Sequence, residues 1–150
     1  MKYFFTCGII LALLVIAHSR CTSSHPIADK GLDIDSSFLG NFTDDYNIRY
    51  SINNNSFIQH PGVRYHLLLY NKEEQYFIAR NDSANVSDGG LYTRIDIMRF
   101  SNMEPWRWGF CLTAYRAPDM ATAIRTAAAD RSNPRKGCGG YPFSRMKRAD

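Results

Sequence analysis

Candidates for acid–base or nucleophilic chemistry are few in this chain, and they are spread along it. His60 and His66 flank a Pro-Gly turn, and Cys111 carries a thiol that a histidine could activate. A cysteine in a disulfide has no free thiol, so a Cys–His pair is a weak hypothesis. Asp44 and Asp45 could supply carboxylates to a cleft. The sequence therefore predicts no catalytic site, and a small hydrolase using Asp44, Asp45 or His66 is kept as a secondary hypothesis.

Metal and cofactor chemistry finds no better support. A metal site needs His, Cys or carboxylate groups clustered at ligand spacing, and the sequence shows no such cluster. His60 and His66 could converge on a metal, but side chains at the surface or at the rim of a pocket are the favoured interpretation. The glycines of residues 137–140 lack the strand-to-helix context of a phosphate-binding loop. We therefore expect neither a metal nor a cofactor.

Aromatic side chains are stronger candidates for binding. The segment 106–115, WRWGFCLTAY, places Trp106, Trp108 and Phe110 at every second position and Cys111 on the opposite face. If this row faces a cavity, it forms the wall of a site for a small apolar ligand. Other aromatic residues that could join the wall are Tyr46, Tyr50 and Tyr65. The alternative is that the same side chains simply fill the core.

Arg94 and Asp96 form another candidate binding site, which is polar. They share one face of a predicted strand, and Ile95 and Ile97 occupy the other. Facing inward, the pair would be a polar anchor for a ligand or part of a buried network, so Arg94 counts as a candidate ligand-binding residue. Facing outward, the favoured interpretation, the two would form an ordinary cross-strand pair worth roughly 0.2 to 1 kcal/mol.

The elements that carry these residues are short strands. From Phe38 on, apolar and polar residues alternate, with turn residues between the segments. The segments are 39–42, 46–53, 56–59, 63–69, 75–80, 91–100 and 106–115. No segment before residue 116 has a helical period, and the short connections allow only hairpins. We therefore predict a mainly β fold, an antiparallel meander that forms a small barrel or sandwich.

The pattern changes in the last thirty or so residues. Asp119 can cap a helix whose apolar stripe runs from Met120 to Ala128, and Asn133-Pro134 would end it. Residues 141–146 could then return as a closing edge strand. We therefore predict one C-terminal helix, packed on the sheet or across an open end of the barrel.

The N-terminal residues indicate export. Lys2 is followed by an apolar run over residues 8–17 and by Ala17-His18-Ser19, a pattern suited to signal peptidase. We predict a signal peptide over residues 1–19, a flexible tether over 20–37 and a single β-rich domain over 38–150. An uncleaved anchor and a lipid attached to Cys21 are alternatives. The expected location is secreted, periplasmic or extracellular, without stable membrane insertion after cleavage.

The cysteines fit an oxidising compartment. Cys111 and Cys138 lie in the folded part, where a disulfide would close a loop of roughly 27 residues and contribute about 3 to 4 kcal/mol. It would clamp the helix and the last strand onto the segment 106–115. Cys21 is then the odd cysteine: free, bonded to another chain or removed by processing.

Net charge limits the choice of partner. The chain has 18 basic and 14 acidic residues, a net charge of +4, with basic clusters only at 131–135 and 145–148. Proteins that bind nucleic acid usually show a concentrated basic face with stacking aromatics, so we expect no nucleic acid partner. The two clusters are interpreted as solvated charges or, alternatively, as a contact for an anion or an acidic partner.

The order of these elements resembles that of the lipocalins (calycins). The resemblance consists of an export signal, a Gly-x-aromatic start at Gly40-Asn41-Phe42, a strand meander, a single late helix, a short closing strand and a disulfide tying the tail to the barrel. Phe42 stands where the lipocalin pattern has tryptophan, the later Asp-Tyr motif finds no match, and Arg107 is the candidate for the last-strand arginine. The resemblance implies an interior pocket for a small apolar ligand.

The expected function follows from these observations. We expect an exported, non-enzymatic binding protein whose partner is a small apolar ligand or a protein. An interaction module, such as an inhibitor or a surface factor, would present the polar loop 81–90 and the basic tail. The third hypothesis is the small hydrolase.

Overall fold

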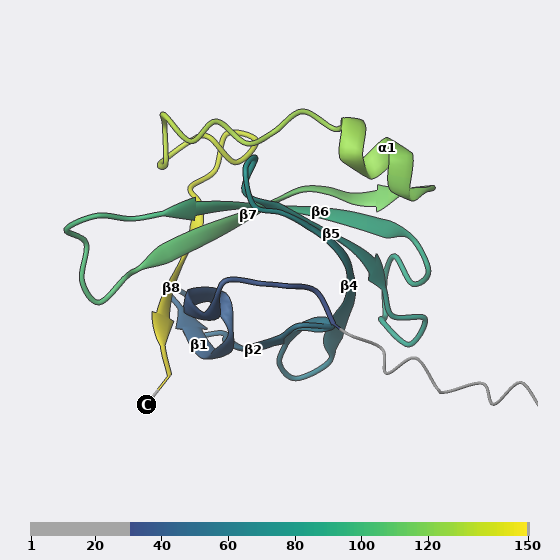
Figure 1. The fold of residues 1–150 in the computed structure, drawn as a ribbon, viewed down its shortest axis with the longest axis horizontal. Coiled ribbons are helices and arrows are strands. Elements are labelled where there is room, and N and C mark those ends of the chain that lie inside the picture. The colour runs from purple at the N-terminus through teal and green to yellow at the C-terminus, as the bar shows by residue number, and fades with distance from the viewer. Residues whose placement is uncertain (1–30, 150) are drawn as a thin grey trace, which may run out of the picture.

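The computed structural model describes residues 31–149, which fold into a closed antiparallel barrel (Figure 1). Each strand pairs with the next, and the last returns to the first. The strands are β1 (Gly40–Asp44), β2 (Arg49–Asn53), β3 (Ser56–Gln59), β4 (Val63–Asn71), β5 (Tyr76–Asn81), β6 (Tyr92–Arg99), β7 (Trp108–Ala117) and β8 (Ser144–Arg148). The predicted antiparallel meander is confirmed, and it closes as a barrel. The predicted signal peptide and residues 20–30 lie outside the described residues.

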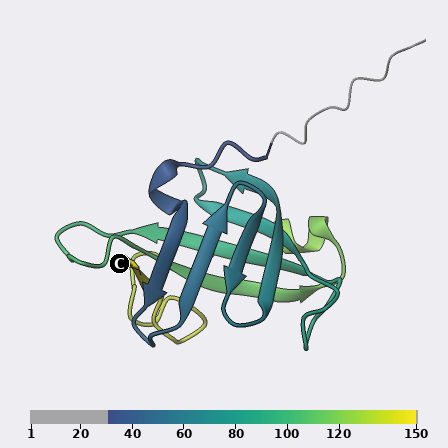
Figure 2. The same cartoon turned by 90° about the horizontal axis from the view of Figure 1, so that it is seen from below.

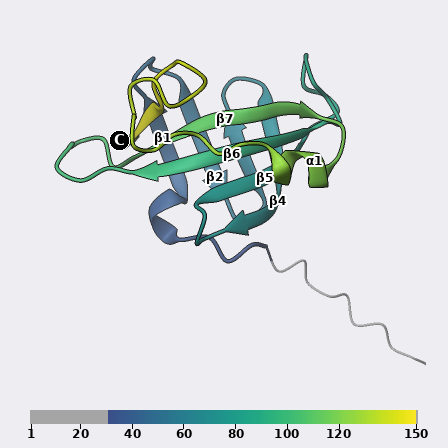
Figure 3. The same cartoon turned by 90° about the horizontal axis from the view of Figure 1, so that it is seen from above.

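Two short helices complete the fold. The 3-10 helix η1 (Ser36–Phe38) precedes β1, and α1 (Met120–Arg125) lies between β7 and β8. Viewed from below, β1 to β4 form the near wall (Figure 2). Viewed from above, α1 and the chain that follows it cross the outside of β5, β6 and β7 (Figure 3). The helix therefore covers the sheet rather than an end of the barrel.

The barrel interior is filled with aromatic side chains. Trp108 is only 1% exposed and contacts Phe38 and Phe42 edge to face, each with its ring centroid 5.2 Å away. Phe110 makes similar contacts with Tyr50 and Phe57, at 5.5 and 5.3 Å. Interlocked rings of this kind leave little space between them, because protein cores pack as densely as organic crystals. The aromatic row predicted from alternation is thus mainly core.

The folded part begins earlier than the predicted tether allowed. Ile34 is buried, and the Leu32 amide donates to the Asn54 carbonyl at 3.1 Å. Arg99 lies over the ring of Phe38 at 4.3 Å and bonds Asp35 at 2.7 Å. Residues 32–37 were expected in the tether. They lie on the barrel instead, because Ile34 is buried in the core and Leu32 packs against it.

A last-strand arginine packs against β1, but it is not Arg107. Arg148 of β8 lies 4.6 Å from the ring centroid of Phe42 and donates to the carbonyls of Leu39 and Ser36. Gly40 adopts a φ of 116°, and a Cβ there would collide with the Arg148 guanidinium. Arg107 precedes β7 and is exposed. Arg107 therefore does not lie in the last strand, which spans residues 144–148 and ends further along the chain than the predicted 141–146.

Strand β7 also departs from the predicted alternation. It begins at Trp108, because Trp106 lies in a turn and donates its amide to the Met103 carbonyl at 2.8 Å. The register with β6 shifts between the pairs Ile95–Leu112 and Arg94–Ala114, which leaves Thr113 as an extra residue. After this bulge, the residues of β7 point to the opposite faces of the sheet from those that simple alternation predicts.

Helix α1 is shorter than its alanine pattern predicted. Asp119 is the N-cap, as expected, and accepts from the Thr122 amide at 2.7 Å. The helix stops at Arg125, and four residues later the Ala129 amide donates to the buried carboxylate of Asp96. The Ala129–Asp96 contact stands where a further turn of helix was predicted. Ala127 and Ala128 are therefore exposed, and they do not form the buried face of a helix.

Candidate functional site

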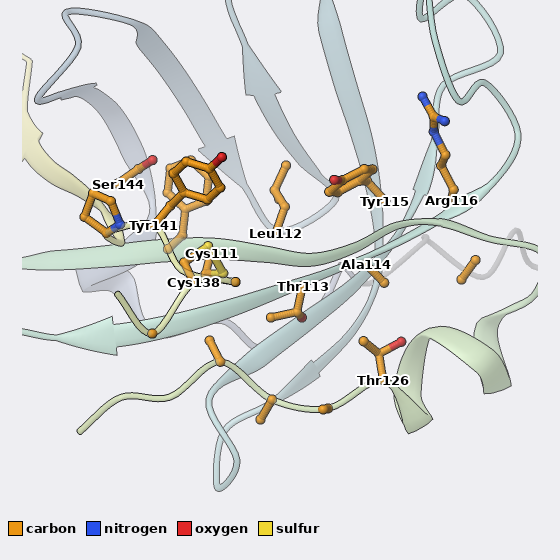
Figure 4. A pocket seen from close by; sticks show the side chains of 18 of the residues that line it. Cys111, Leu112, Thr113, Ala114, Tyr115, Arg116, Thr126, Cys138, Tyr141 and Ser144 are labelled. Carbon is orange, nitrogen blue, oxygen red and sulfur yellow. A yellow bond between two sulfur atoms is a disulfide. The ribbon is translucent and has the colours of Figure 1, made fainter. Parts of the chain in front are cut away.

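A wide groove of about 1050 Å³ runs along β7 (Figure 4). One wall comes from the β1–β2 turn and the start of β2, with Tyr46, Ile48 and Tyr50. The other wall is the chain after α1, residues 126–129, together with the loop around Cys138. Most of the side chains that line it are apolar or aromatic. A hollow of this size is in the range that holds small ligands.

The groove exists because β8 is short. It pairs with β7 only at Trp108, Gly109 and Phe110. β7 continues to Ala117, and within residues 31–149 no strand pairs with this side of it beyond Phe110. The barrel wall is therefore one strand short along the second half of β7, and we call this stretch, residues 112–116, the free edge.

Side chains leave the free edge in two directions. Leu112, Tyr115 and Arg116 project to one side, while Thr113 and Ala114 point toward the segment that follows α1 (Figure 4). The bulge at Thr113 causes this arrangement, since simple alternation would have placed Tyr115 with Cys111. Leu112 and Ala114 thus both border the groove although they lie on opposite faces of the strand.

Three tyrosines stand around the groove with unusually large exposure. Tyr46 is 62%, Tyr115 52% and Tyr141 74% exposed. Tyrosine combines a large apolar ring with a hydroxyl and few rotatable bonds, and it is enriched among residues that dominate binding surfaces. The rim of the groove therefore offers contact area to a ligand at low entropic cost.

At the β1–β2 turn, the end of the groove holds a buried acid, Asp44. The Tyr50 hydroxyl donates to Asp44 at 3.0 Å, and Asp44 also accepts from the amides of Tyr46 and Ile48, at 2.9 and 2.8 Å. Burial, together with the neighbouring Asp44 charge, raises the pKa of Tyr50 well above its ordinary value. Asp44 is thus engaged in holding the turn that carries Tyr46, and Tyr50 stays neutral.

The predicted ligand wall is only partly assembled. Tyr46, Tyr50 and Phe110 do line the groove. Trp108 and Tyr65 lie in the packed interior. Trp106 lies outside the barrel, where Arg145 and Lys147 approach its ring at 5.2 and 5.5 Å.

Arg94 faces outward, as the favoured interpretation has it, but it belongs to a buried network and not to an exposed cross-strand pair. It points away from the barrel interior, yet it is 3% exposed because the chain after α1 covers it, and its partner Asp96 is 0% exposed. Arg94 bonds Asp96 at 3.1 Å, donates to the Ile124 carbonyl at 2.8 Å and stacks on Tyr76 at 3.9 Å. It fastens α1 to the sheet and does not line the groove.

The predicted disulfide is confirmed. Cys111 and Cys138 are bonded at 2.03 Å, and both line the groove. The bridge attaches the tail to the outer face of β7 next to the free edge, so it supports one wall. Cys21 lies outside the described residues.

The histidines and the second acid make separate local contacts. His60 bonds the Ser51 hydroxyl at 2.9 Å, His66 bonds Asp82 at 2.8 Å, and Asp45 bonds Arg145 at 2.8 Å. Within residues 31–149, no group of three or more His, Cys, Asp or Glu side chains could hold a metal ion. In the same range, no helix is long and apolar enough to cross a membrane.

Sequence reasoning missed several residues of the groove. Leu112 was assigned to the core face, and it does pack against the core, but it also lines the groove. Tyr115 and Tyr141 carried no signal beyond their type. Ala127 and Ala128 were assigned to a buried helical stripe, yet they line a wall. Their places depend on where β8 ends, which no local pattern encodes.

Comparison of the chain with protein-family models, curated proteins and solved structures finds no match.

Proposed function

We propose that this chain is an exported, non-enzymatic binding protein of lipocalin-like architecture that takes the apolar part of its ligand in the groove along β7. The observation that carries the proposal is the difference between the barrel interior and the groove along β7. The interior is occupied by interlocked aromatic rings, whereas the groove is open and lined mainly by apolar side chains. Ligand pockets are typically concave and apolar, with a few polar groups that set orientation.

The lipocalin-like part of the proposal rests on architecture. An eight-stranded antiparallel meander, a helix after β7 and a closing strand match the expected order. The contact of Arg148 with Phe42 supplies the last-strand arginine that the resemblance calls for. Export is supported by the N-terminal sequence and by a disulfide, since disulfides persist in oxidising compartments.

A hydrolase is the less favoured alternative. Of its three candidate residues, Asp44 and Asp45 are neighbours at the end of β1, whereas His66 lies on β4. Asp44 accepts three hydrogen bonds that hold its own turn, and Asp45 pairs with Arg145. His66 pairs with Asp82 on a different wall, so the three do not converge on one substrate atom.

Binding of the neutral fluorescent probe N-phenyl-1-naphthylamine tests the proposal. The wild-type chain should enhance the emission of the probe in a saturable manner, and Leu112→Glu should weaken binding at least tenfold, because it places a charge in the apolar groove. Leu68→Glu is the matched control, since Leu68 is exposed on β4 away from the groove. Circular dichroism checks that both variants fold. Equal binding by the wild type and Leu112→Glu would place the ligand elsewhere and contradict the proposal.

A further inference from the structure

We infer that the natural occupant of the groove is an extended acidic polypeptide segment that adds to β7 as an additional strand. The inference rests on the proposed function and specifies its ligand class. It combines three features of the molecule: the free edge, the tyrosine rim and the distribution of charge.

The free edge supplies a backbone template. Strand edges present a row of amide and carbonyl groups, and proteins usually blunt such rows with proline, charged side chains or covering segments. The free edge contains no proline, and its one charged residue, Arg116, lies at its end. The stretch from Cys111 to Ala117 extends about 20 Å at roughly 3.3 Å per residue, enough to pair with five or six residues of a partner strand.

The groove places side-chain contacts on both faces of such a strand. Residues of an added strand would point alternately to the barrel side and to the outer side. The barrel side offers Leu112 and Tyr115, and Tyr46 of the β1–β2 turn also lines the groove. The outer side offers the alanines of residues 127–129 and the disulfide. Both sides are predominantly apolar, so alternate side chains of the partner would each find a partly buried place.

Charge selects an acidic partner. Residues 112–148, which include the free edge and the wall that follows α1, contain eight basic and two acidic residues, a net charge of +6; of these basic residues Arg116 lines the groove itself, and the others lie around it or further away. Residues 31–111 contain seven basic and ten acidic residues, a net charge of −3. Within the described part of the chain, Arg135, Lys136 and Lys147 form no ion pair. A second copy of the chain would bring two such basic regions together, so an acidic strand from another protein fits better.

A peptide experiment tests the inference directly. Peptides are selected from a random displayed decapeptide library on the full chain, and the most enriched one is synthesised with and without N-methyl groups on alternate backbone amides. We expect enrichment of Asp and Glu among β-forming residues. We expect binding to weaken at least tenfold on N-methylation and at least tenfold between 50 and 500 mM salt. Amide hydrogen exchange should slow within residues 112–116 when the peptide binds.

Variants locate the site and separate this inference from the proposed function. Leu112→Glu should abolish peptide binding, and Leu68→Glu should leave it unchanged. If N-phenyl-1-naphthylamine binds the groove but the selected peptides are not acidic, or bind equally well when N-methylated, the inference fails and the proposed function stands. If neither probe binds, both fail.

Two other occupants are outcomes that would overturn the inference. Cosedimentation with phosphatidylglycerol vesicles that is lost in Leu112→Glu would identify a membrane surface as the ligand. A dimer detected by analytical ultracentrifugation and disrupted by Leu112→Glu would identify a second copy of this chain.

Discussion

Asp96 on β6 accepts a hydrogen bond at 3.1 Å from Arg131, which lies beyond α1 in the segment that crosses the outside of the barrel. The same buried carboxylate accepts from Arg94 at 3.1 Å, from the Thr113 hydroxyl at 2.6 Å and from the Ala129 amide at 3.3 Å. One acid thus joins β6, the bulge of β7 and the chain that forms a wall of the groove. The groove depends on this network as much as on the disulfide.

Replacing Asp96 should therefore destabilise the fold strongly. In Asp96→Asn the guanidinium of Arg94 stays buried without a counter-charge, and the expected loss is about 3 to 5 kcal/mol in the free energy of unfolding. Urea denaturation followed by circular dichroism measures it. Asp88→Asn is the matched control, because Asp88 pairs with the exposed Arg116 and surface pairs contribute about 0 to 1 kcal/mol. Equal effects of the two variants would refute a special role for Asp96.

Removing the disulfide should lower stability and loosen the groove. The double variant Cys111→Ser, Cys138→Ser is expected to lose about 3 to 4 kcal/mol, as the bridge closes a loop of 27 residues. Binding of N-phenyl-1-naphthylamine should also weaken, since both cysteines line the groove. Unfolding of the oxidised and reduced wild type gives an independent measurement. A melting temperature insensitive to reduction would contradict the prediction.

The two tryptophans should respond differently to truncation. Trp108→Ala leaves a cavity at the centre of the aromatic core and should cost about 3 to 5 kcal/mol. Trp106→Ala should cost about 1 kcal/mol, because Trp106 lies outside the barrel and contacts mainly Arg145 and Lys147. Within the described residues the Trp108 indole N–H has no hydrogen-bond partner, so Trp108→Phe should be much milder than Trp108→Ala. Denaturant titration of the three variants checks this order.

Alkaline pH should unfold the chain through its buried tyrosines. Burial raises the pKa of Tyr50 and of Tyr65, and Asp44 adds to the effect at Tyr50. A raised pKa in the folded state means that these hydroxyls favour folding below about pH 10, the ordinary value for tyrosine. That contribution is lost as the pH rises above 10, when the unfolded chain ionises and the folded chain does not.

Absorbance at 295 nm measures this ionisation against pH. We expect a late step that coincides with the loss of near-ultraviolet circular dichroism. In Tyr50→Phe the late step should shrink, whereas Tyr141→Phe, at an exposed position, should leave it intact. Early, reversible ionisation of all tyrosines without unfolding would show that Tyr50 and Tyr65 are accessible to solvent.

Local sequence patterns predicted most of the barrel. Alternation in segments such as 63–69 and 91–100 identifies strands without any knowledge of their neighbours, because a strand that buries one face needs a period of two. Asp119 was recognised as a cap for the same local reason. The pairing of Cys111 with Cys138 followed from the small number of cysteines in the folded part.

The candidate site was harder to predict because it depends on distant segments. Tyr46, Tyr50 and Phe110 were expected in the wall of an interior pocket and line the groove instead, whereas Trp106 lies outside β7 and takes no part in the predicted row. The alternation of β7 fails at Thr113, where the register with β6 shifts. A bulge is decided by cross-strand pairing and leaves no clear local pattern.

The sequence by itself determined an antiparallel meander, its aromatic core and the disulfide partners, because periodicity and residue type act over a few positions. Only the tertiary structure decided that β8 meets β7 at three residues and leaves the remaining edge open. It also decided that Arg94 and Asp96 lie buried beneath the chain that follows α1. These outcomes depend on packing and hydrogen bonding between segments about thirty residues apart. No single stretch of the sequence contains both partners of those contacts, so local patterns do not predict them.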